Sequence, residues 1–340
     1  MSRIAIIGAG AWGTALSIVL GRNGKHSIRL WAHEREVLES ISELRVNELF
    51  LSGYSIPPSV TGTNDLEKVL EDAEIVVSAM PSQHCRIVFQ KMRPHLRADM
   101  LLVSATKGLE EKTLLRMTEV IRQILAIEDG PDSKIAALSG PSFAVEAARG
   151  DPSAITIASK NIEVARIIQR EFSDPRFRLY TNDDVTGVEL CGALKNIIAI
   201  ASGVCHGLGL GHNSIAALIT RGLAEISRLV VACGGRQETV AGLAGLGDLV
   251  LTCTGGLSRN RTVGVELGRG RRLPEIIAGM HGMVAEGVFT TYAAVDLAHS
   301  RGIEMPITKQ MFAILHEGKS PAEAIRDLMA RASKSEMALD

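Results

Sequence analysis

The first thirteen residues constrain the fold of this chain more than any other stretch. Residues 3–7 are mostly β-branched and apolar, and they run directly into the glycine-rich segment GAGAWG at residues 8–13. The apolar run predicts a strand buried on both faces, and residues 14–20 predict a helix directly after the glycines. A helix N-terminus at this place would direct free N–H groups and the positive end of its dipole at an anion. The pattern predicts a Rossmann-type dinucleotide site; the alternative is a glycine turn that only lets the helix pack on the strand.

Length and charge bound the class of protein. The chain has 340 residues, of which 46% are hydrophobic and 22% charged, as in a compact soluble protein long enough for two domains. Its 37 basic and 38 acidic side chains leave a net charge of −1, which gives no overall electrostatic attraction for nucleic acid or an anionic membrane. A phosphate-bearing ligand must therefore be held by individually placed residues.

The cysteines indicate a reducing compartment. There are five of them, an odd number, and no two stand in C-x-x-C spacing. This pattern fits reduced thiols better than a disulfide framework or a zinc site. We expect all five to be small core residues: Cys85, Cys191, Cys205, Cys233 and Cys253.

No segment of the sequence predicts export or membrane insertion. The N-terminal apolar run is only as long as a strand and lacks a cleavage-site pattern. The most apolar later segment, residues 197–204, is far shorter than a membrane span and follows Lys195 and Asn196. We therefore expect a cytoplasmic protein.

The residues after the second expected strand bear on the choice of cofactor. In a Rossmann unit, an acidic residue about twenty positions beyond the glycines holds the ribose hydroxyls, whereas Arg or His suits a 2′-phosphate. Residues 33–36 are His-Glu-Arg-Glu and carry both signs. We expect NADP to be accepted through His33 or Arg35, with NAD as the alternative; otherwise these charges only open a solvated helix.

Strands and helices alternate as far as about residue 180. Two expected strands end in Met80-Pro81 and Thr106-Lys107-Gly108, and a third ends in the small-residue turn that begins at Ser139. Ligands of open parallel sheets bind outside the carboxyl ends of the strands, so these ends share an edge with the glycine loop. The expected strands are residues 3–7, 26–32, 60–61, 74–79, 100–105, 134–138, 154–158 and 177–180, and the expected helices between them include residues 113–125 and 161–171.

From Asp184 onward the apolar residues recur at helical spacing, and no convincing strand follows. We predict an α/β fold: a mostly parallel Rossmann domain with helices on both faces at residues 1–188, then an all-helical substrate-binding domain at residues 189–340. The boundary near Val188 should lie inside a helix. The glycine-rich stretches 207–211 and 242–256 are expected to be tight connections between helices. The expected helices are residues 188–204, 214–233, 259–267, 288–300, 306–316 and 321–330.

Lys195 is the most informative side chain of the second half, because it lies among small and apolar residues. A buried lysine is costly unless it is paired or used, and burial lowers its pKa toward the range useful for proton transfer. The alternative is a lysine that reaches solvent from a helix edge.

Two further groups carry candidate chemistry. Asp248 stands among apolar residues and needs a partner such as Lys195, unless it is only a helix N-cap. Arg259 and Asn260 follow a glycine pair and open a helix, where a guanidinium and an amide beside free N–H groups would form a phosphate clamp. The alternative for these two residues is a solvated basic turn.

Six sequence blocks together resemble bacterial NAD(P)-dependent glycerol-3-phosphate dehydrogenase. The match runs in order from residue 4 to beyond Glu286, and six blocks in register are far more specific than any one of them. The blocks are GAGAWGTA at residues 8–15, ATKGL at 105–109, SGPSFA at 139–144, ELCGALKN at 189–196, GLGDL at 245–249 and SRN at 258–260.

The resemblance implies reversible reduction of dihydroxyacetone phosphate to sn-glycerol 3-phosphate, which supplies glycerophospholipid synthesis, in a cytoplasmic homodimer. It implies NAD or NADP as cofactor and no metal, with Lys195 as the catalytic acid/base. The implied substrate-binding residues are Lys107, Gly140, Ser142, Lys195, Asp248, Ser258, Arg259 and Asn260. The implied cofactor-binding residues are Gly8, Gly10, Ala11, Trp12, Gly13, His33, Lys107, Ala144, Arg259, Val284 and Glu286.

Two positions depart from the family pattern. Ala11 replaces a serine that is often found in the glycine loop, so a hydroxyl that could bond the pyrophosphate is missing. His33 stands where an arginine is common, which leaves the preference between NADH and NADPH open.

The residues suit the implied reaction. Hydride transfer to a carbonyl carbon leaves negative charge on the oxygen, which needs a proton donor and nearby positive charge, and Lys195 provides both. Lys107, if close, would lower the pKa of Lys195, whereas Asp248 would orient the amine and limit that shift. One rival interpretation is a β-hydroxyacid or ketopantoate-type reductase, which has no need of a phosphate clamp at residues 258–260. Another is a non-catalytic dinucleotide sensor, against which Lys195 and Asp248 argue.

Overall fold

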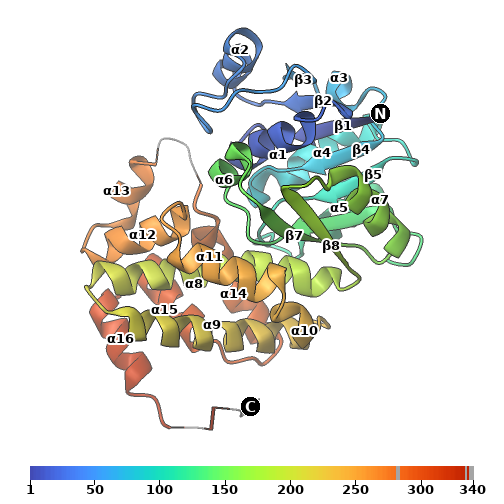
Figure 1. Cartoon of the computed structure of the whole chain (residues 1–340). Coiled ribbons are helices and arrows are strands. Elements are labelled where there is room, and N and C mark those ends of the chain that lie inside the picture. The colour runs from blue at the N-terminus through green and yellow to red at the C-terminus, as the bar shows by residue number, and fades with distance from the viewer. Residues whose placement is uncertain (281–283, 334, 337–340) are drawn as a thin grey trace. The chain divides into compact units, whose positions relative to one another are not determined.

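The computed structural model describes residues 1–280, 284–333 and 335–336. They form two compact units, one with a sheet and one of helices (Figure 1). The first unit comprises Met1–Lys107 and Leu115–Glu189, and the second comprises Gly108–Leu114 and Leu190–Asp340.

The passage from the first unit to the second lies inside helix α8 (Val185–Gly207), between Glu189 and Leu190. The segment Gly108–Leu114 also belongs to the second unit. The predicted division at residue 188 instead assigns this segment to the first domain. Leu109 is buried in the helical core, and Leu114 packs against that core. A loop this short carries no sequence signal of which core its leucines will join.

One eight-stranded sheet forms the centre of the first unit, in the order β3-β2-β1-β4-β5-β6-β7-β8. Every neighbouring pair is parallel except β6 and β7, which pair antiparallel. The predicted mostly parallel sheet is therefore confirmed, and each expected strand is present with its ends slightly shifted. The strands are β1 (Ser2–Ile7), β2 (His26–Trp31), β3 (Val60–Thr63), β4 (Ile75–Ser78), β5 (Leu101–Ser104), β6 (Ile135–Ser139), β7 (Ser153–Ala158) and β8 (Phe177–Asn182).

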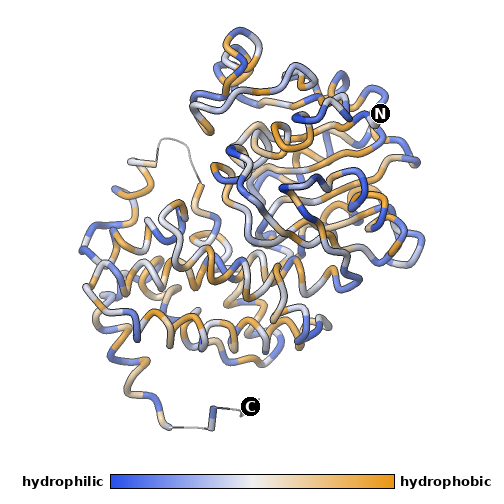
Figure 2. Tube along the Cα trace, in the orientation of Figure 1, coloured by the Kyte–Doolittle hydropathy of each residue, from blue (hydrophilic) through white to orange (hydrophobic). Residues whose placement is uncertain are grey.

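Both faces of the sheet are buried, as the alternation along β1 shows. Ile4 and Ile6 belong to one hydrophobic core, and Ala5 and Ile7 belong to another. Figure 2 shows the central strands mostly in the hydrophobic colour, as expected of a parallel sheet covered on both sides. The helices that contribute to the first core are α1 (Ala11–Gly21), α2 (Arg35–Leu44), α6 (Ala144–Arg149) and α7 (Ile162–Phe172). Those that contribute to the second core are α3 (Leu66–Leu70), α4 (Cys85–Met92) and α5 (Met117–Leu125). Short 3-10 turns lie at Ser82–His84 and Arg93–His95.

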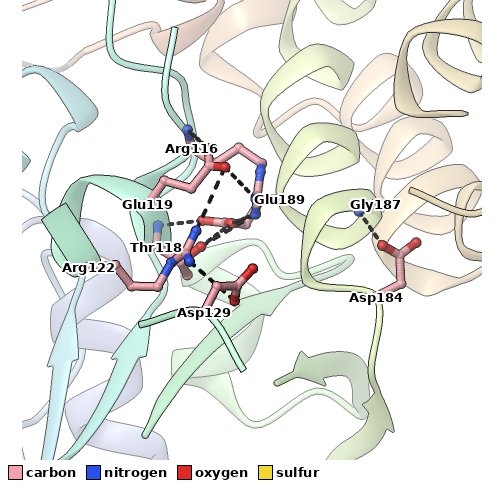
Figure 3. A network of polar contacts seen from close by, with 8 residues as sticks. All are labelled: Arg116, Thr118, Glu119, Arg122, Asp129, Asp184, Gly187 and Glu189. Atoms are coloured by element: carbon pink, nitrogen blue, oxygen red, sulfur yellow. Dashed lines mark hydrogen bonds and ion pairs between the residues drawn. The ribbon is translucent and has the colours of Figure 1, made fainter. Parts of the chain in front are cut away.

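A buried ionic network joins the start of α5 to the first turns of α8 (Figure 3). The Glu189 carboxylate accepts hydrogen bonds from the Arg116 guanidinium at 2.7 Å and from the backbone N–H of Thr118 at 2.8 Å. Burial raises the pKa of Glu189, and the charge of Arg116 opposes that shift. Arg116 also pairs with Glu119 at 2.8 Å, so that α5 begins after Arg116 and not at residue 113 as expected. The network fixes the part of α8 that belongs to the first unit.

The second unit is all-helical, and the described residues after Asn182 contain no strand, as predicted. Its core is centred on α8, whose buried residues include Leu194, Ile197 and Ile198. The other helices are α9 (His212–Ala232), α10 (Gln237–Val240), α11 (Asp248–Thr254), α12 (Arg259–Gly268), α13 (Leu273–Ala278), α14 (Glu286–Ser300), α15 (Pro306–His316) and α16 (Pro321–Met329).

Two sequence expectations were wrong in this unit. Residues 242–256 are not merely a connection, because they contain a π-helical turn (Leu243–Gly247) that continues into α11. The five glycines of residues 242–256 obscure these helical turns in the sequence. Gly245 is nevertheless required there, because a Cβ would lie 2.0 Å from the carbonyl oxygen of Val240. Cys233 is half-buried, whereas the other four cysteines are buried.

By length and composition, α8 could cross a membrane, and so could the bent pair formed by residues 237–254 and Arg259–Gly268. The apolar window of α8 is entirely buried inside the protein. A buried central helix of a globular unit has this composition because every one of its faces is packed.

Candidate active site

The glycine loop between β1 and α1 packs tightly at both ends and is open in the middle. Gly8 has a φ of 116°, and a Cβ there would lie 2.8 Å from the carbonyl oxygen of Ala79. A Cβ at Gly13 would lie 1.9 Å from the carbonyl oxygen of Gly8. By contrast, no atom lies within 4 Å of a Cβ built at Gly10. The loop backbone therefore leaves space at Gly10 that a ligand can fill.

The N-terminus of α1 is suited to an anion. Gly10 is the N-cap and has no side-chain capping bond, and the first intrahelical bond runs from the Thr14 N–H to the Gly10 carbonyl at 2.9 Å. The N–H groups of Ala11, Trp12 and Gly13 precede that bond, at the positive end of the helix dipole. These residues fit the pyrophosphate of NAD or NADP, with Ala11 offering only its backbone N–H.

Two basic side chains stand where β2 leads into α2. His33 is exposed, and its ring centroid lies 5.7 Å from that of Trp31. Arg35 is also exposed and forms an ion pair with Glu39 at 2.7 Å. Both side chains are accessible to a ribose phosphate, although Arg35 is already paired with the Glu39 carboxylate of its own helix.

The ends of β5 and β6 bring several predicted site residues together in the first unit. The Lys107 ammonium donates to the carbonyl oxygen of Gly140 at 3.2 Å, and the Ser142 hydroxyl donates to the same oxygen at 2.9 Å. Gly140 has a φ of 142°, and a Cβ there would lie 2.9 Å from Cα of Ile155. Ala144 follows as the first residue of α6. The predicted proximity of the strand ends is therefore confirmed for these residues.

In the second unit, Lys195 and Asp248 form a buried ion pair, as expected. The distance from Lys195 Nζ to Asp248 Oδ1 is 2.5 Å, and the two residues are 6% and 1% exposed. Asp248 is the first residue of α11 and not its N-cap, which is Gly247, so the capping alternative is excluded. A carboxylate in the first turn of a helix is stabilised by the helix dipole.

Thr252 is a member of this group that the sequence analysis missed. Its hydroxyl accepts a hydrogen bond from Lys195 Nζ at 2.7 Å and donates to the Asp248 carbonyl at 2.6 Å. The spacing of four residues between Asp248 and Thr252 places both on one face of a helix. Because residues 242–256 were expected to be a connection and not a helix, the spacing did not point to Thr252. Burial raises the pKa of the adjacent Cys253 thiol to about 12, so this sulfur stays neutral beside the ion pair.

The N-terminus of α12 carries the predicted phosphate clamp. Ser258 is its N-cap and accepts from the Arg261 N–H at 3.2 Å, Arg259 is exposed, and Asn260 is buried. The surrounding protein partly desolvates the Arg259 guanidinium and lowers its pKa, although the residue still reaches solvent, and the nearby Glu286, the first residue of α14, opposes that shift. Val284 is half-buried just ahead of Glu286.

Asn260 is oriented by two partners. Its amide nitrogen donates to Asn196 Oδ1 at 3.0 Å, and its amide oxygen accepts from the Gly287 N–H at 2.9 Å. Asn196 follows Lys195 directly, so the clamp on α12 is linked to the helix that carries the buried lysine. The sequence analysis did not assign a role to Asn196, because its partner lies 64 positions away.

Close packing of glycines brings α12 against α8. A Cβ at Gly203 would lie 2.1 Å from the carbonyl oxygen of Arg261, and one at Gly264 would lie 1.9 Å from that of Ile200. This approach lets Arg259 and Asn260 lie in one unit with the Lys195–Asp248 pair. Among the residues that the structure describes, no group of three or more His, Cys, Asp or Glu side chains could hold a metal ion.

Fold and site together define a nicotinamide-dependent dehydrogenase with a Rossmann unit and a helical unit. Comparison with known sequences specifies the family: residues 3–165 match the NAD-dependent glycerol-3-phosphate dehydrogenase N-terminus, and residues 184–326 match the corresponding C-terminus. The chain belongs to the NAD-dependent glycerol-3-phosphate dehydrogenase family.

Three relatives illustrate the similarity. The glycerol-3-phosphate dehydrogenase [NAD(P)+] of Koribacter versatilis is 66% identical over 337 residues, with 99% of each chain covered. That of Acidobacterium capsulatum is 57% identical, covering 99% of this chain and 100% of its own. The crystal structure of glycerol-3-phosphate dehydrogenase from Coxiella burnetii superposes with a TM-score of 0.92 at 42% identity, covering 97% of this chain and 99% of its own.

Proposed function

We propose that this chain catalyses the reversible reduction of dihydroxyacetone phosphate by NADH or NADPH, with uptake of one proton, to give sn-glycerol 3-phosphate and the oxidised cofactor. The observation that carries the proposal is the buried Lys195–Asp248 pair in the same helical unit as Arg259 and Asn260 at a helix N-terminus. Reduction of this substrate requires a proton donor for its carbonyl oxygen and a binding site for its phosphate group. Family membership supports the same reaction.

The residues act in distinct ways. Bound NAD(P)H supplies the hydride that the substrate's carbonyl carbon accepts. Lys195 donates a proton to the carbonyl oxygen, and its positive charge stabilises that oxygen as negative charge grows on it. Asp248 and Thr252 hold the amine in one orientation, so little reorganisation is needed when the proton moves.

The remote phosphate group positions the reacting carbon. Arg259 and Asn260 would bind it with the help of the free N–H groups at the start of α12, and Ser258 would contact it through its hydroxyl. Binding energy from this non-reacting group is then used to hold the carbonyl in place. Lys107, Gly140 and Ser142 are the further substrate contacts that we propose.

The first unit is the proposed cofactor-binding domain and the helical unit the proposed substrate-binding domain. Gly8, Gly10, Ala11, Trp12 and Gly13 would hold the pyrophosphate. His33, Lys107, Ala144, Arg259, Val284 and Glu286 are the other proposed cofactor contacts. The exposed basic side chains of His33 and Arg35 favour NADP modestly over NAD.

We further propose a cytoplasmic homodimer without membrane insertion, whose product supplies glycerophospholipid synthesis. The balanced charge of −1 and the complete burial of the apolar window of α8 support a protein that does not associate with membranes. Sedimentation of the purified chain tests the dimer.

An absorbance assay tests the function. Purified protein is mixed with NADH or NADPH and one of two substrates, dihydroxyacetone phosphate or ketopantoate, and loss of reduced-nicotinamide absorbance is followed. Rapid oxidation only with the phosphorylated substrate is the expected result. Oxidation with ketopantoate alone would favour the rival reductase, and cofactor binding without oxidation of either would favour a sensor.

A further inference from the structure

A buried asparagine far from the glycine motif holds the glycine loop in place. Asn47 lies between α2 and β3 and is 0% exposed. Its amide nitrogen donates to the carbonyl oxygen of Ala9 at 2.7 Å and to the Thr14 hydroxyl at 2.8 Å. Its amide oxygen accepts from the Phe50 N–H at 3.1 Å. All polar atoms of the side chain are therefore engaged, and both donor bonds end on the loop or on the first turn of α1.

We infer that Asn47 is a positioning residue for the cofactor's pyrophosphate, although it does not touch the cofactor. This inference rests on the proposed function. The Thr14 hydroxyl accepts from Asn47 and itself donates to the Ala9 carbonyl at 3.2 Å, so the three groups form a closed set of bonds. In this arrangement the carbonyl of Ala9 is fixed by two donors.

The orientation of that carbonyl decides the orientation of the next N–H group. In a trans peptide the C=O and the following N–H point in opposite directions, so a fixed Ala9 carbonyl also fixes the Gly10 N–H. Gly10 is the position where the loop backbone is open. An unrestrained peptide could turn its carbonyl oxygen toward a bound pyrophosphate, which would be repulsive, whereas Asn47 keeps the carbonyl facing the protein interior.

The segment that carries Asn47 has its own supports. The backbone N–H of Leu51 donates to the Asn47 carbonyl at 3.0 Å, and the Arg45 guanidinium donates to the carbonyls of Ile56 and Val60 at 3.0 and 2.9 Å. These bonds do not involve the side-chain amide of Asn47. A substitution at Asn47 should therefore loosen the glycine loop, and in the supporting segment it removes only the bond from the Phe50 N–H.

The test is the affinity for cofactor, measured with and without turnover. Asn47→Leu keeps the branched shape of the side chain at a somewhat larger volume, and it removes both donor bonds and the acceptor of the Phe50 N–H. Each buried hydrogen bond contributes about 0.5–1.5 kcal/mol, so we expect the Kd for NADPH and NADH, by fluorescence, to rise about tenfold. Binding of ADP-ribose, by calorimetry, should weaken in parallel, because this probe carries the pyrophosphate without the nicotinamide. The kcat at saturating cofactor and the KM for dihydroxyacetone phosphate should change less than about twofold, since the lost bonds lie at the pyrophosphate loop.

A control and a second variant keep this test decisive. Asn161 is the N-cap of α7 in the same unit and accepts from the Glu163 N–H at 3.1 Å, so Asn161→Ala should lower the thermal midpoint without weakening ADP-ribose binding. If Asn47→Leu does not fold, Thr14→Val removes the bond from Asn47 to the Thr14 hydroxyl and the long bond from that hydroxyl to the Ala9 carbonyl, and should weaken ADP-ribose binding about threefold. Unchanged ADP-ribose affinity in the folded variants would overturn the role of Asn47. Failure of the wild-type protein to bind either cofactor would instead refute the proposed function.

Discussion

Lys195 Nζ on α8 lies 2.5 Å from Asp248 Oδ1 on α11, although the two residues are 53 positions apart in sequence. Both side chains are buried, so neither charge would be tolerated without the other. The ion pair therefore keeps the Lys195 ammonium charged at a buried position, where it would stabilise negative charge on the substrate's carbonyl oxygen. Thr252 accepts from the same amine and fixes its direction.

The phosphate clamp predicts a substrate-specific defect. Arg259→Ala removes a charge-assisted contact worth about 1.5–3 kcal/mol, so the KM for dihydroxyacetone phosphate should rise about 10- to 150-fold. The Kd for cofactor should change much less, because Arg259 is only one of many proposed cofactor contacts and the glycine loop is unaltered. Arg269→Ala, at the other end of α12, is the matched control and should leave KM unchanged. An unaltered KM in Arg259→Ala would refute the clamp.

Cofactor preference can be tested at the end of β2. His33→Asp combined with Arg35→Ala should move the ratio of kcat/KM for NADPH over NADH toward NADH, because a carboxylate repels a 2′-phosphate and holds ribose hydroxyls. Glu39→Ala removes only the partner of Arg35 and serves as the control. A ratio that does not change would place the choice of cofactor at other residues.

Much of the fold and part of the site were predictable because their signals are local. The strand, glycines and helix of residues 3–20 are consecutive, and Lys195 stands out within a single apolar helix. Asn47 and Glu189 could not be assigned roles from sequence, because Ala9 and Arg116 lie 38 and 73 positions from them. The helical turns at 243–254 were missed since glycine ordinarily disfavours helix, and here close packing requires it.

Glu225 predicts a pH dependence of stability. From α9, its buried carboxylate accepts from the Ile307 and Thr308 N–H groups at the start of α15, at 2.6 and 3.2 Å. Burial raises the pKa of Glu225 from 4.5 to about 7, while these bonds and Arg228 oppose the shift. The folded state then holds a proton that the unfolded state releases, so this residue's contribution to stability falls as the pH rises from about 4.5 to 7.

Comparing Glu225→Gln with wild type isolates this effect. The difference in unfolding free energy between the two should shrink by an amount on the order of 3 kcal/mol between pH 4.5 and pH 8, because only the wild type loses the proton. Glu304→Gln, an exposed site near the start of α15, is the control. Urea unfolding at several pH values provides the measurement, and a difference that stays constant with pH would contradict the prediction.

The Glu189 network predicts a large stability effect. Glu189→Ala leaves the half-buried Arg116 with Glu119 as its remaining ion-pair partner in the network, and breaking a buried pair on one side costs up to about 3–5 kcal/mol. We expect a marked fall in the thermal midpoint. Glu163→Ala removes an exposed pair with Arg166 and should have almost no effect. Similar midpoints for both variants would show that the network is not stabilising.

The central claim is that Lys195 is the proton donor, and Lys195→Met tests it most directly. The variant keeps much of the apolar length of the side chain but has no proton or charge to offer. Because the buried Asp248 carboxylate then loses its cationic partner, the thermal midpoint should fall, and the double variant Lys195→Met with Asp248→Asn should recover part of the loss. Lys309→Met, at an exposed site on α15, controls for loss of a lysine.

The deciding measurement is kcat for dihydroxyacetone phosphate reduction, taken with the cofactor Kd on the same folded preparation. Loss of a positioned proton donor costs about 10²–10⁴ in rate, and loss of electrostatic support for the oxyanion adds to it. The account predicts near-normal cofactor binding, since the glycine loop lies in the other unit, with kcat reduced at least a hundredfold, as that range implies. A folded Lys195→Met protein that binds cofactor and retains more than about a tenth of the wild-type kcat would contradict it.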